Sequence, residues 1–194
     1  FRDISGQRPS VDTKEPKLRL NARLNRDRVQ LSIDLAGESL HRRGYRRASG
    51  SAPLKENLAA ALLLRSGWPN IFKRGGGLID PMCGGGTFLI EAAMIARDIA
   101  PGLLRRKFGF ESWKFHKAPV WESLISEARA RRIAGLKNFC SDIRGFDIDP
   151  SAIEAARLNI AACDLDKHIH VAVKQIDQID DVSSEIRGLV ITNP

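Results

Sequence analysis

Two short stretches near the start of the chain alternate apolar and polar residues with a period of two. Residues 17–24 read KLRLNARL, and residues 28–35 read RVQLSIDL. Between them lies NRD at 25–27, a sequence typical of a turn. The pattern predicts a β-hairpin, in which the first strand carries one apolar face made of Leu18, Leu20, Ala22 and Leu24.

The pattern changes after residue 75, where short apolar runs alternate with longer helical patterns. The apolar runs predict strands over 78–80, 143–147, 168–174 and 187–192. Helical periodicity predicts helices over 54–66, 88–100, 121–138 and 151–162. Strands that alternate with helices indicate βαβ units and a parallel sheet with helices on both faces. We therefore expect an α/β fold, a partial Rossmann-like doubly wound and mostly parallel sheet preceded by a small β-hairpin segment.

The amino-acid composition indicates the class of protein but does not identify a function. The chain has 194 residues, of which 43% are hydrophobic and 28% charged, as is usual for a soluble globular protein. It has no apolar run long enough for a membrane span and no secretory signal, so we expect no membrane partner. Three cysteines without a CxxC pair predict neither a disulfide scaffold nor a metal site, and favour the cytoplasm. The missing initiator Met and the small number of strands lead us to expect a fragment. Oligomeric state is not predicted.

The net charge of +8 is unevenly distributed. Residues 1–77 contain 16 Lys and Arg against 7 Asp and Glu, whereas residues 78–194 contain 15 against 16. Such asymmetry favours contact between the basic part and a polyanion, although a solubilising surface has the same composition. The loop at 41–52 contains the predicted RNA-binding residues Arg42, Arg43, Tyr45 and Arg46. We expect the arginines to bind phosphate groups and the tyrosine to stack on a base. The alternative is a solvated basic hairpin end.

The first candidate site lies in the turn Asp80-Pro81-Met82-Cys83-Gly84-Gly85-Gly86-Thr87, between a predicted strand and a predicted helix. Glycines let a ligand approach the backbone, and the helix start offers unpaired N–H groups. The turn lacks the lysine of a phosphate loop and the third glycine of a dinucleotide fingerprint. An acid at the strand end suits a positively charged ligand group, such as the ammonium of a methionine-type cofactor. A purely structural turn is the alternative.

Three further polar positions follow predicted strands. Asp147 is placed to accept hydrogen bonds from a ribose diol, whereas Asp149 suits a helix cap, unless both acids cap the helix. Asp177 can accept from the exocyclic amine of adenine, or belong to a solvated acidic loop. Asn193, followed by Pro194, can hold a planar exocyclic amine for attack on a methyl group.

Two residue types are assigned no catalytic chemistry. Cys83 lies near a helix N-terminus, where thiol pKa values fall, but its motif contains no histidine to act as a base. We therefore expect a small packing residue. The four histidines show no metal-ligand spacing.

Several of these segments together resemble one enzyme family. The turn at 80–87 resembles the first motif of class I S-adenosylmethionine-dependent methyltransferases, and Asp147, Asp177 and Asn193-Pro194 follow in the order of its later motifs. Three segments narrow the likeness: LAGESLHRRGYR, APLKENLAAALL and DPMCGGGTFLIEAA, at 35–46, 52–63 and 80–93. They resemble the THUMP-containing guanine-N2 methyltransferases of bacterial large-subunit ribosomal RNA, as does the spacer containing PGLLRRKFGFESW at 101–113.

The resemblance implies a fold division and a set of roles. Residues 1–48 would be the end of a THUMP-type RNA-binding domain with its linker, and residues 49–194 a truncated methyltransferase domain. S-adenosylmethionine would be the cofactor and 23S ribosomal RNA the partner. Asn193 and Pro194 would begin the catalytic motif that holds the guanine amine. The predicted cofactor-binding residues are Asp80, Pro81, Cys83, Gly84, Gly86, Thr87, Asp147, Ile148 and Asp177.

Other functions remain open at this point. A non-catalytic RNA-binding module would use the basic segment alone and bind no cofactor. A methyltransferase could act instead on tRNA or another acceptor. An NAD-type oxidoreductase is disfavoured by the missing third glycine.

Overall fold

The structure, a computed structural model, describes residues 4, 6, 11–14, 16–48, 53–137, 142–179 and 188–194. The chain divides into two compact units. The first comprises residues 1–39 with 106–118, and the second comprises residues 40–105 with 119–194.

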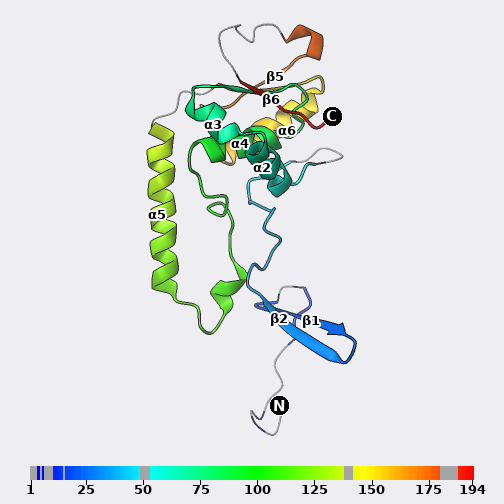
Figure 1. The fold of residues 1–194 in the computed structure, drawn as a ribbon, viewed down its shortest axis with the longest axis vertical. Coiled ribbons are helices and arrows are strands. Elements are labelled where there is room, and N and C mark those ends of the chain that lie inside the picture. The colour runs from blue at the N-terminus through cyan, green and yellow to red at the C-terminus, as the bar shows by residue number, and fades with distance from the viewer. Residues whose placement is uncertain are drawn as a thin grey trace. The chain divides into compact units, whose positions relative to one another are not determined.

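The predicted hairpin forms the main element of the first unit. Strands β1 (Arg19–Asn25) and β2 (Arg28–Asp34) pair antiparallel, and are drawn in blue in Figure 1. The two-residue turn contains Arg26 at a φ of 53°, in the left-handed region. The register sets the apolar residues opposite one another: Leu20 faces Ile33, Ala22 faces Leu31 and Leu24 faces Val29. This confirms the period-two prediction, yet Leu20 and Leu24 of that face are exposed in the described structure, and Leu18 is half-buried.

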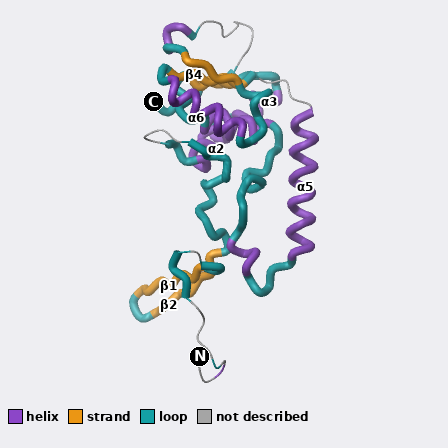
Figure 2. Tube along the Cα trace, turned by 180° about the vertical axis from the view of Figure 1, so that it is seen from behind, coloured by secondary structure: helices purple, strands orange, loops and turns teal. Residues whose placement is uncertain are grey.

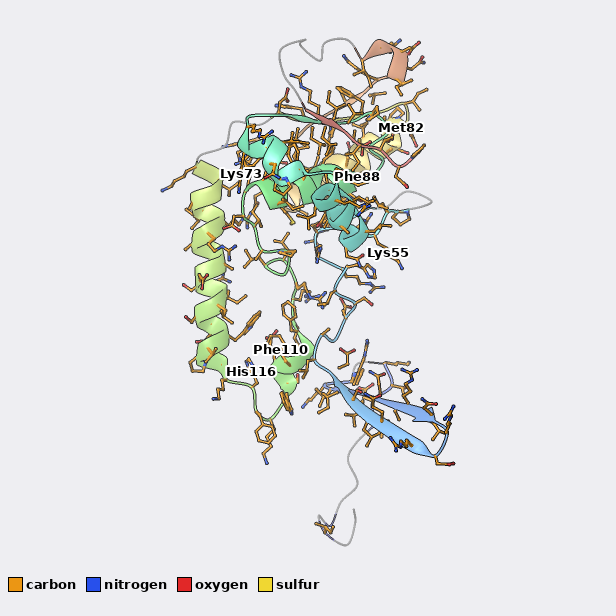
Figure 3. All side chains as sticks on the ribbon, in the orientation of Figure 1. Lys55, Lys73, Met82, Phe88, Phe110 and His116 are labelled. Carbon is orange, nitrogen blue, oxygen red and sulfur yellow. The ribbon has the colours of Figure 1, made fainter. Side chains whose placement is uncertain are left out.

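A second segment of the chain joins this unit. Gly109 N donates to Ala36 O at 3.2 Å, and Phe110 N donates to Leu35 O at 2.9 Å. These bonds hold the 3-10 helix η1 (Gly109–Ser112) beside the end of the hairpin. The Phe110 ring lies 5.5 Å from that of His116, and both side chains are labelled in Figure 3.

The second unit contains a four-stranded parallel sheet. Its strands are β3 (Leu78–Asp80), β4 (Ile143–Asp147), β5 (His170–Val173) and β6 (Leu189–Val190). They lie in the order β5-β4-β3-β6, and each neighbouring pair is parallel. The predicted α/β fold with a mostly parallel sheet is thus confirmed.

Five helices accompany this sheet in the described part of the chain: α2 (Glu56–Arg65), α3 (Trp68–Lys73), α4 (Thr87–Ala96), α5 (Ala118–Lys137) and α6 (Pro150–Ala161). Figures 1 and 2 show α2, α3 and α6 on the same side of the sheet, and Figure 1 shows α4 among them. Helix α4 is buried from Thr87 to Met94, because its residues are apolar on nearly every side. It packs against the buried strand residues Leu78 and Ile143.

The structure also corrects several predicted boundaries. Helix α4 ends at Ala96 rather than at residue 100, because Asp98 adopts a positive φ of 54° and Ile99 N bonds back to Met94 O. Helix α3 has no counterpart among the predictions, although Pro69 in its first turn is a usual start signal. Strand β6 has two residues where six were expected.

Candidate functional site at the carboxyl edge of the sheet

The strand order brings four predicted polar residues to one edge of the sheet. Asp80 ends β3 and Asp147 ends β4, while Asp177 and Asn193 come a few residues after β5 and β6. Neighbouring strands are parallel, so their carboxyl ends meet at the same edge. The order along this edge is Asp177, Asp147, Asp80, Asn193. Open α/β sheets bind ligands at this edge, where the strand order reverses.

The glycine turn at 81–86 needs glycine at two places. Gly84 has a φ of 51° and Gly86 a φ of 79°, values that residues with a Cβ rarely adopt. A Cβ at Gly86 would also lie 3.3 Å from the Cβ of Ala156 on α6. Gly86 caps α4, so the turn leads directly into the positive end of a buried helix.

Asp147 holds this turn from the neighbouring strand. Its Oδ2 accepts from Gly84 N at 2.9 Å, and its Oδ1 accepts from Asp149 N at 3.0 Å. Each carboxylate oxygen has a second lone pair, and the residue is half-buried. Asp147 can therefore accept further hydrogen bonds from a ligand while it positions the glycine turn.

Asp149 has a different task two residues later. Its side chain accepts from Ser151 Oγ at 2.7 Å and from Ser151 N at 2.8 Å, and caps α6. These two hydrogen bonds hold the pKa of Asp149 below the ordinary value. Asp147 and Asp149 therefore have different roles. Asp149 is the cap, as predicted, and Asp147 faces the glycine turn.

Asp80 is buried at the end of β3, with 1% of its surface exposed. Its Oδ1 accepts from Met82 N at 3.2 Å. Burial raises the pKa of Asp80 to about 6, because desolvation disfavours the carboxylate. The negative charge of Asp147 adds to this rise, and the hydrogen bond from Met82 N partly offsets it. Its ionisation is thus poised close to neutral pH.

Cys83 is a packing residue, as predicted. Burial raises the pKa of its thiol well above the ordinary value, and the charges of Asp80 and Asp147 raise it further. The thiolate is therefore disfavoured, which excludes a nucleophilic role. The thiol lies against Gly145 of β4, where an added Cβ would lie 3.0 Å from Sγ and would clash with Leu89.

The other predicted cofactor residues differ in exposure. Pro81 and Thr87 are buried beside Cys83, whereas Ile148 is 65% exposed. Asp177 lies in the 3-10 helix η2 (Ile176–Gln178) and is exposed, as are Asn193 and Pro194. The edge thus combines a buried turn with exposed groups on either side of it. Met82, within the turn, and Phe88, two residues after it, are labelled in Figure 3.

The predicted RNA-binding loop has a structural role at three of its four positions. We call residues 40–48 the strap. Tyr45 is 1% exposed, and its hydroxyl lies 3.3 Å from Glu91 Oε1. Arg43 lies 3.4 Å from the same carboxylate, and burial raises the pKa of Glu91, an effect that the charge of Arg43 opposes. A stacking role for Tyr45 is therefore wrong, because no base can reach its ring.

Arg46 also makes hydrogen bonds within the second unit. Its Nε bonds to Glu56 Oε1 at 3.0 Å, and its Nη2 bonds to Leu54 O at 2.9 Å and to Thr87 Oγ1 at 3.1 Å. Buried acids thus bond to both Arg43 and Arg46, and phosphate contact by these two residues stays a prediction. Arg42 is exposed, and its RNA contact stays a prediction.

Asn159 on α6 is the polar residue of this region that the sequence analysis missed. It is fully buried and bonds to both the strap and the glycine turn. The available signal was its position in ARLNIAA, a polar side chain among apolar neighbours, since a buried amide requires hydrogen-bond partners. Glu91, a single charge within the apolar run FLIEAAMIA, gave the same signal.

The described residues contain no cluster of three His, Cys, Asp or Glu placed to hold a metal ion. None of their helices is both long and apolar enough to cross a membrane.

Comparisons with known proteins agree with this geometry. Residues 43–194 match the family model described as RMKL-like, methyltransferase domain. The ribosomal RNA large subunit methyltransferase K/L of Saccharophagus degradans is 51% identical over 196 residues, covering 100% of this chain. The chain spans 26% of that relative, about a quarter of its length.

Two solved structures resemble the chain. One, described as a methyltransferase complexed with SAH, is 36% identical, with a TM-score of 0.71 over 91% of this chain and 44% of its own. Another, described as a possible methylase from Clostridium difficile, is 33% identical, with a TM-score of 0.80 over 100% of this chain and 48% of its own.

Proposed function

Because the chain belongs to the family of RMKL-like methyltransferase domains, we propose that it binds S-adenosylmethionine and methylates an amine of large-subunit ribosomal RNA. One observation carries this proposal most directly. The four polar residues of the sheet edge stand in the order that a nucleoside with an amino-acid tail requires, next to a glycine turn that allows close approach.

The residues at this edge fit such a cofactor. Asp147 has free lone pairs for the two ribose hydroxyls, and Asp177 on the adjacent strand end would accept from the adenine amine. Ile148 would offer an exposed apolar surface between them. Gly84 and Gly86, with Asp80 behind them, would surround the charged methionine part. Pro81, Cys83 and Thr87 would shape the turn from within.

The acceptor would lie on the other side of Asp80, next to Asn193. When bound, S-adenosylmethionine supplies a methyl group on a positively charged sulfur, so positioning of the amine provides most of the rate enhancement. The Asn193 amide can accept a hydrogen bond from an exocyclic amine and orient its lone pair. Pro194 restricts the backbone directly after it. A base paired in a duplex cannot reach such a site, so the nucleotide would be flipped out.

The relative's name favours large-subunit ribosomal RNA as the substrate, and the resemblance favours guanine N2 as the acceptor. On this basis residues 1–48 would be the end of a THUMP-type RNA-binding domain, and residues 49–194 part of the methyltransferase domain. We place the protein in the cytoplasm, where ribosomal RNA is available to it.

Titration calorimetry separates this function from the alternatives. We expect S-adenosylmethionine to bind the full chain with one site, and NAD to produce no binding heat. A non-catalytic RNA-binding module would bind RNA and neither cofactor. Transfer of labelled methyl groups to purified 23S ribosomal RNA, with tRNA as the competing acceptor, then identifies the substrate. Labelling of tRNA alone would contradict the proposed acceptor.

A further inference from the structure

We propose that Asn159 is a positioning residue for the cofactor turn, which it connects to the strap. The inference deepens the proposed function and rests on it for the identity of the ligand. Asn159 lies on α6, outside every motif that the sequence analysis assigned to the cofactor.

The Asn159 amide uses its full hydrogen-bonding capacity. Its Oδ1 accepts from Arg47 N at 2.7 Å and from Ala48 N at 3.1 Å. Its Nδ2 donates to Ala48 O and to Gly85 O, both at 3.0 Å. An amide has two acceptor lone pairs and two donor hydrogens, so all four are occupied. The side chain is 0% exposed, so water cannot replace these partners.

This hydrogen-bond pattern determines which side chains are tolerated at position 159. The oxygen faces two N–H groups and the nitrogen faces two carbonyls, so only one orientation of the amide satisfies all four. An aspartate has the same shape but would set a carboxylate oxygen against the carbonyls of Gly85 and Ala48. The aspartate would lack the two amide N–H donors, and its carboxylate oxygen would repel the two carbonyl oxygens.

The turn is held from two sides. From β4, Phe146 O accepts from Cys83 N at 2.8 Å and Asp147 Oδ2 accepts from Gly84 N at 2.9 Å. From α6, Asn159 fixes the carbonyl of Gly85. Between these contacts lie Gly84 and Gly86 in left-handed conformations. The Gly85 carbonyl is thus held toward α6, which sets the peptide plane that enters Gly86.

The strap adds a second contact to the same turn. Arg47 and Ala48 bond to Asn159, and Arg46 Nη2 donates to Thr87 Oγ1 at 3.1 Å in the first turn of α4. Both ends of the segment Gly85–Thr87 are therefore bonded to the strap, one directly and one through Asn159. The basic loop at 41–48 therefore supports the cofactor turn.

The test compares Asn159→Asp with Asn70→Asp in the full chain. Asn70 is exposed on α3, so the control makes the same chemical change away from the turn. We expect the Kd for S-adenosylmethionine to rise at least tenfold in Asn159→Asp and to stay within twofold in Asn70→Asp. Ile153→Ala, a buried change on α6, controls for lost stability and should leave the Kd unchanged at a temperature where the protein remains folded.

A second measurement needs no cofactor. Amide hydrogen exchange at Gly84 and Gly86 should accelerate at least tenfold in Asn159→Asp, relative to the strand amides of Leu78 and Ile143. Failure of the wild-type protein to bind S-adenosylmethionine would overturn the proposed function, whereas the exchange result would still decide the role of Asn159. Unchanged exchange at both glycines would overturn the inference.

A third measurement covers the case in which Asn159→Asp does not fold. The side-chain amide protons of Asn159 in the wild-type chain should exchange at least a hundredfold more slowly than those of Asn70. Equal rates would contradict the hydrogen bonds on which the inference depends. Asn159→Ser, which replaces the amide by a single shorter hydroxyl without adding charge, then replaces Asn159→Asp in the affinity measurement, with the same tenfold expectation.

Discussion

The strap and the hairpin are both rich in arginine, yet they use it differently. Arg43 and Arg46 of the strap bond to Glu91 and Glu56, carboxylates that are 2% and 3% exposed. Arginines 19, 23, 26 and 28 of the hairpin are exposed to solvent. The two segments have similar composition but different surroundings, since buried acids on α2 and α4 bond to arginines of the strap. A cluster of basic residues therefore predicts contact with a polyanion only when no internal acid binds it.

The largest expected effect comes from a matched pair of substitutions. Arg46→Ala leaves Glu56 buried without its partner, and should reduce the free energy of unfolding by about 4 kcal/mol. Arg23→Ala on the hairpin makes the same change in solvent, and should alter it by less than about 0.5 kcal/mol. Urea unfolding of the three proteins measures both. Equal losses would show that the strap is no more integrated than the hairpin.

Asp80, the buried acid at the sheet edge, should make the stability of the protein depend on pH. The native pKa of Asp80 is about 6, above its unfolded value of about 4. The native state therefore binds the proton more tightly, and its stability falls as pH rises from about 4 to about 6. Relative to Asp80→Asn, the wild type should lose about 2–3 kcal/mol across this window.

Denaturant titrations of both proteins at pH 4, 5, 6 and 7 give that difference directly, because other titrating groups are shared. A difference that is constant with pH would mean that Asp80 titrates as an exposed acid does. The affinity for a cationic cofactor should rise over the same pH range as Asp80 ionises, and Asp80→Asn should lack this rise.

For RNA binding we expect the arginines of the hairpin to matter more than those of the strap. If residues 1–48 contact RNA, exposed hairpin arginines make the phosphate contacts. Arg23→Ala together with Arg28→Ala should then weaken binding about tenfold at low salt, and reduce the slope of log affinity against log salt by about 1–2. Tyr45→Phe should leave RNA affinity unchanged. Fluorescence anisotropy at several salt concentrations measures these values, and loss of affinity in Tyr45→Phe alone would reverse the assignment.

The smallest effect concerns an exposed acid. Asp149→Ala removes the cap of α6, and should reduce the free energy of unfolding by about 1 kcal/mol. Because Asp149 points to Ser151 rather than to the glycine turn, cofactor affinity should not change. Thermal unfolding and calorimetry of this variant together separate a cap from a ligand contact.

The sequence pattern was sufficient where the determining interactions are local. Short apolar runs located β3 and β4, and a period of two located the hairpin. The cap at Asp149 followed from its position directly before Pro150. The edge site was predictable as well, since parallel strands bring their carboxyl ends together whatever the details of packing.

Contacts between distant residues were not predictable from the pattern. Arg46 and Thr87 are far apart in the chain, as are Ala48 and Asn159, so nothing local marks the strap as internal. The same limit applies to the hairpin, whose alternation predicts a buried face while the described structure leaves it exposed. Periodicity indicates which residues share a face, but burial depends on what packs against it.

We propose that a nucleoside cofactor lies along the carboxyl edge of the sheet, with its ribose on Asp147. Calorimetric titration of S-adenosylmethionine into the wild type, Asp147→Ala and Asp149→Ala measures whether Asp147 holds the cofactor. We expect Asp147→Ala to weaken binding by about 10- to 100-fold, from the loss of charge-assisted hydrogen bonds, and Asp149→Ala to bind as the wild type does. Equal affinity of all three proteins would contradict this placement of the cofactor.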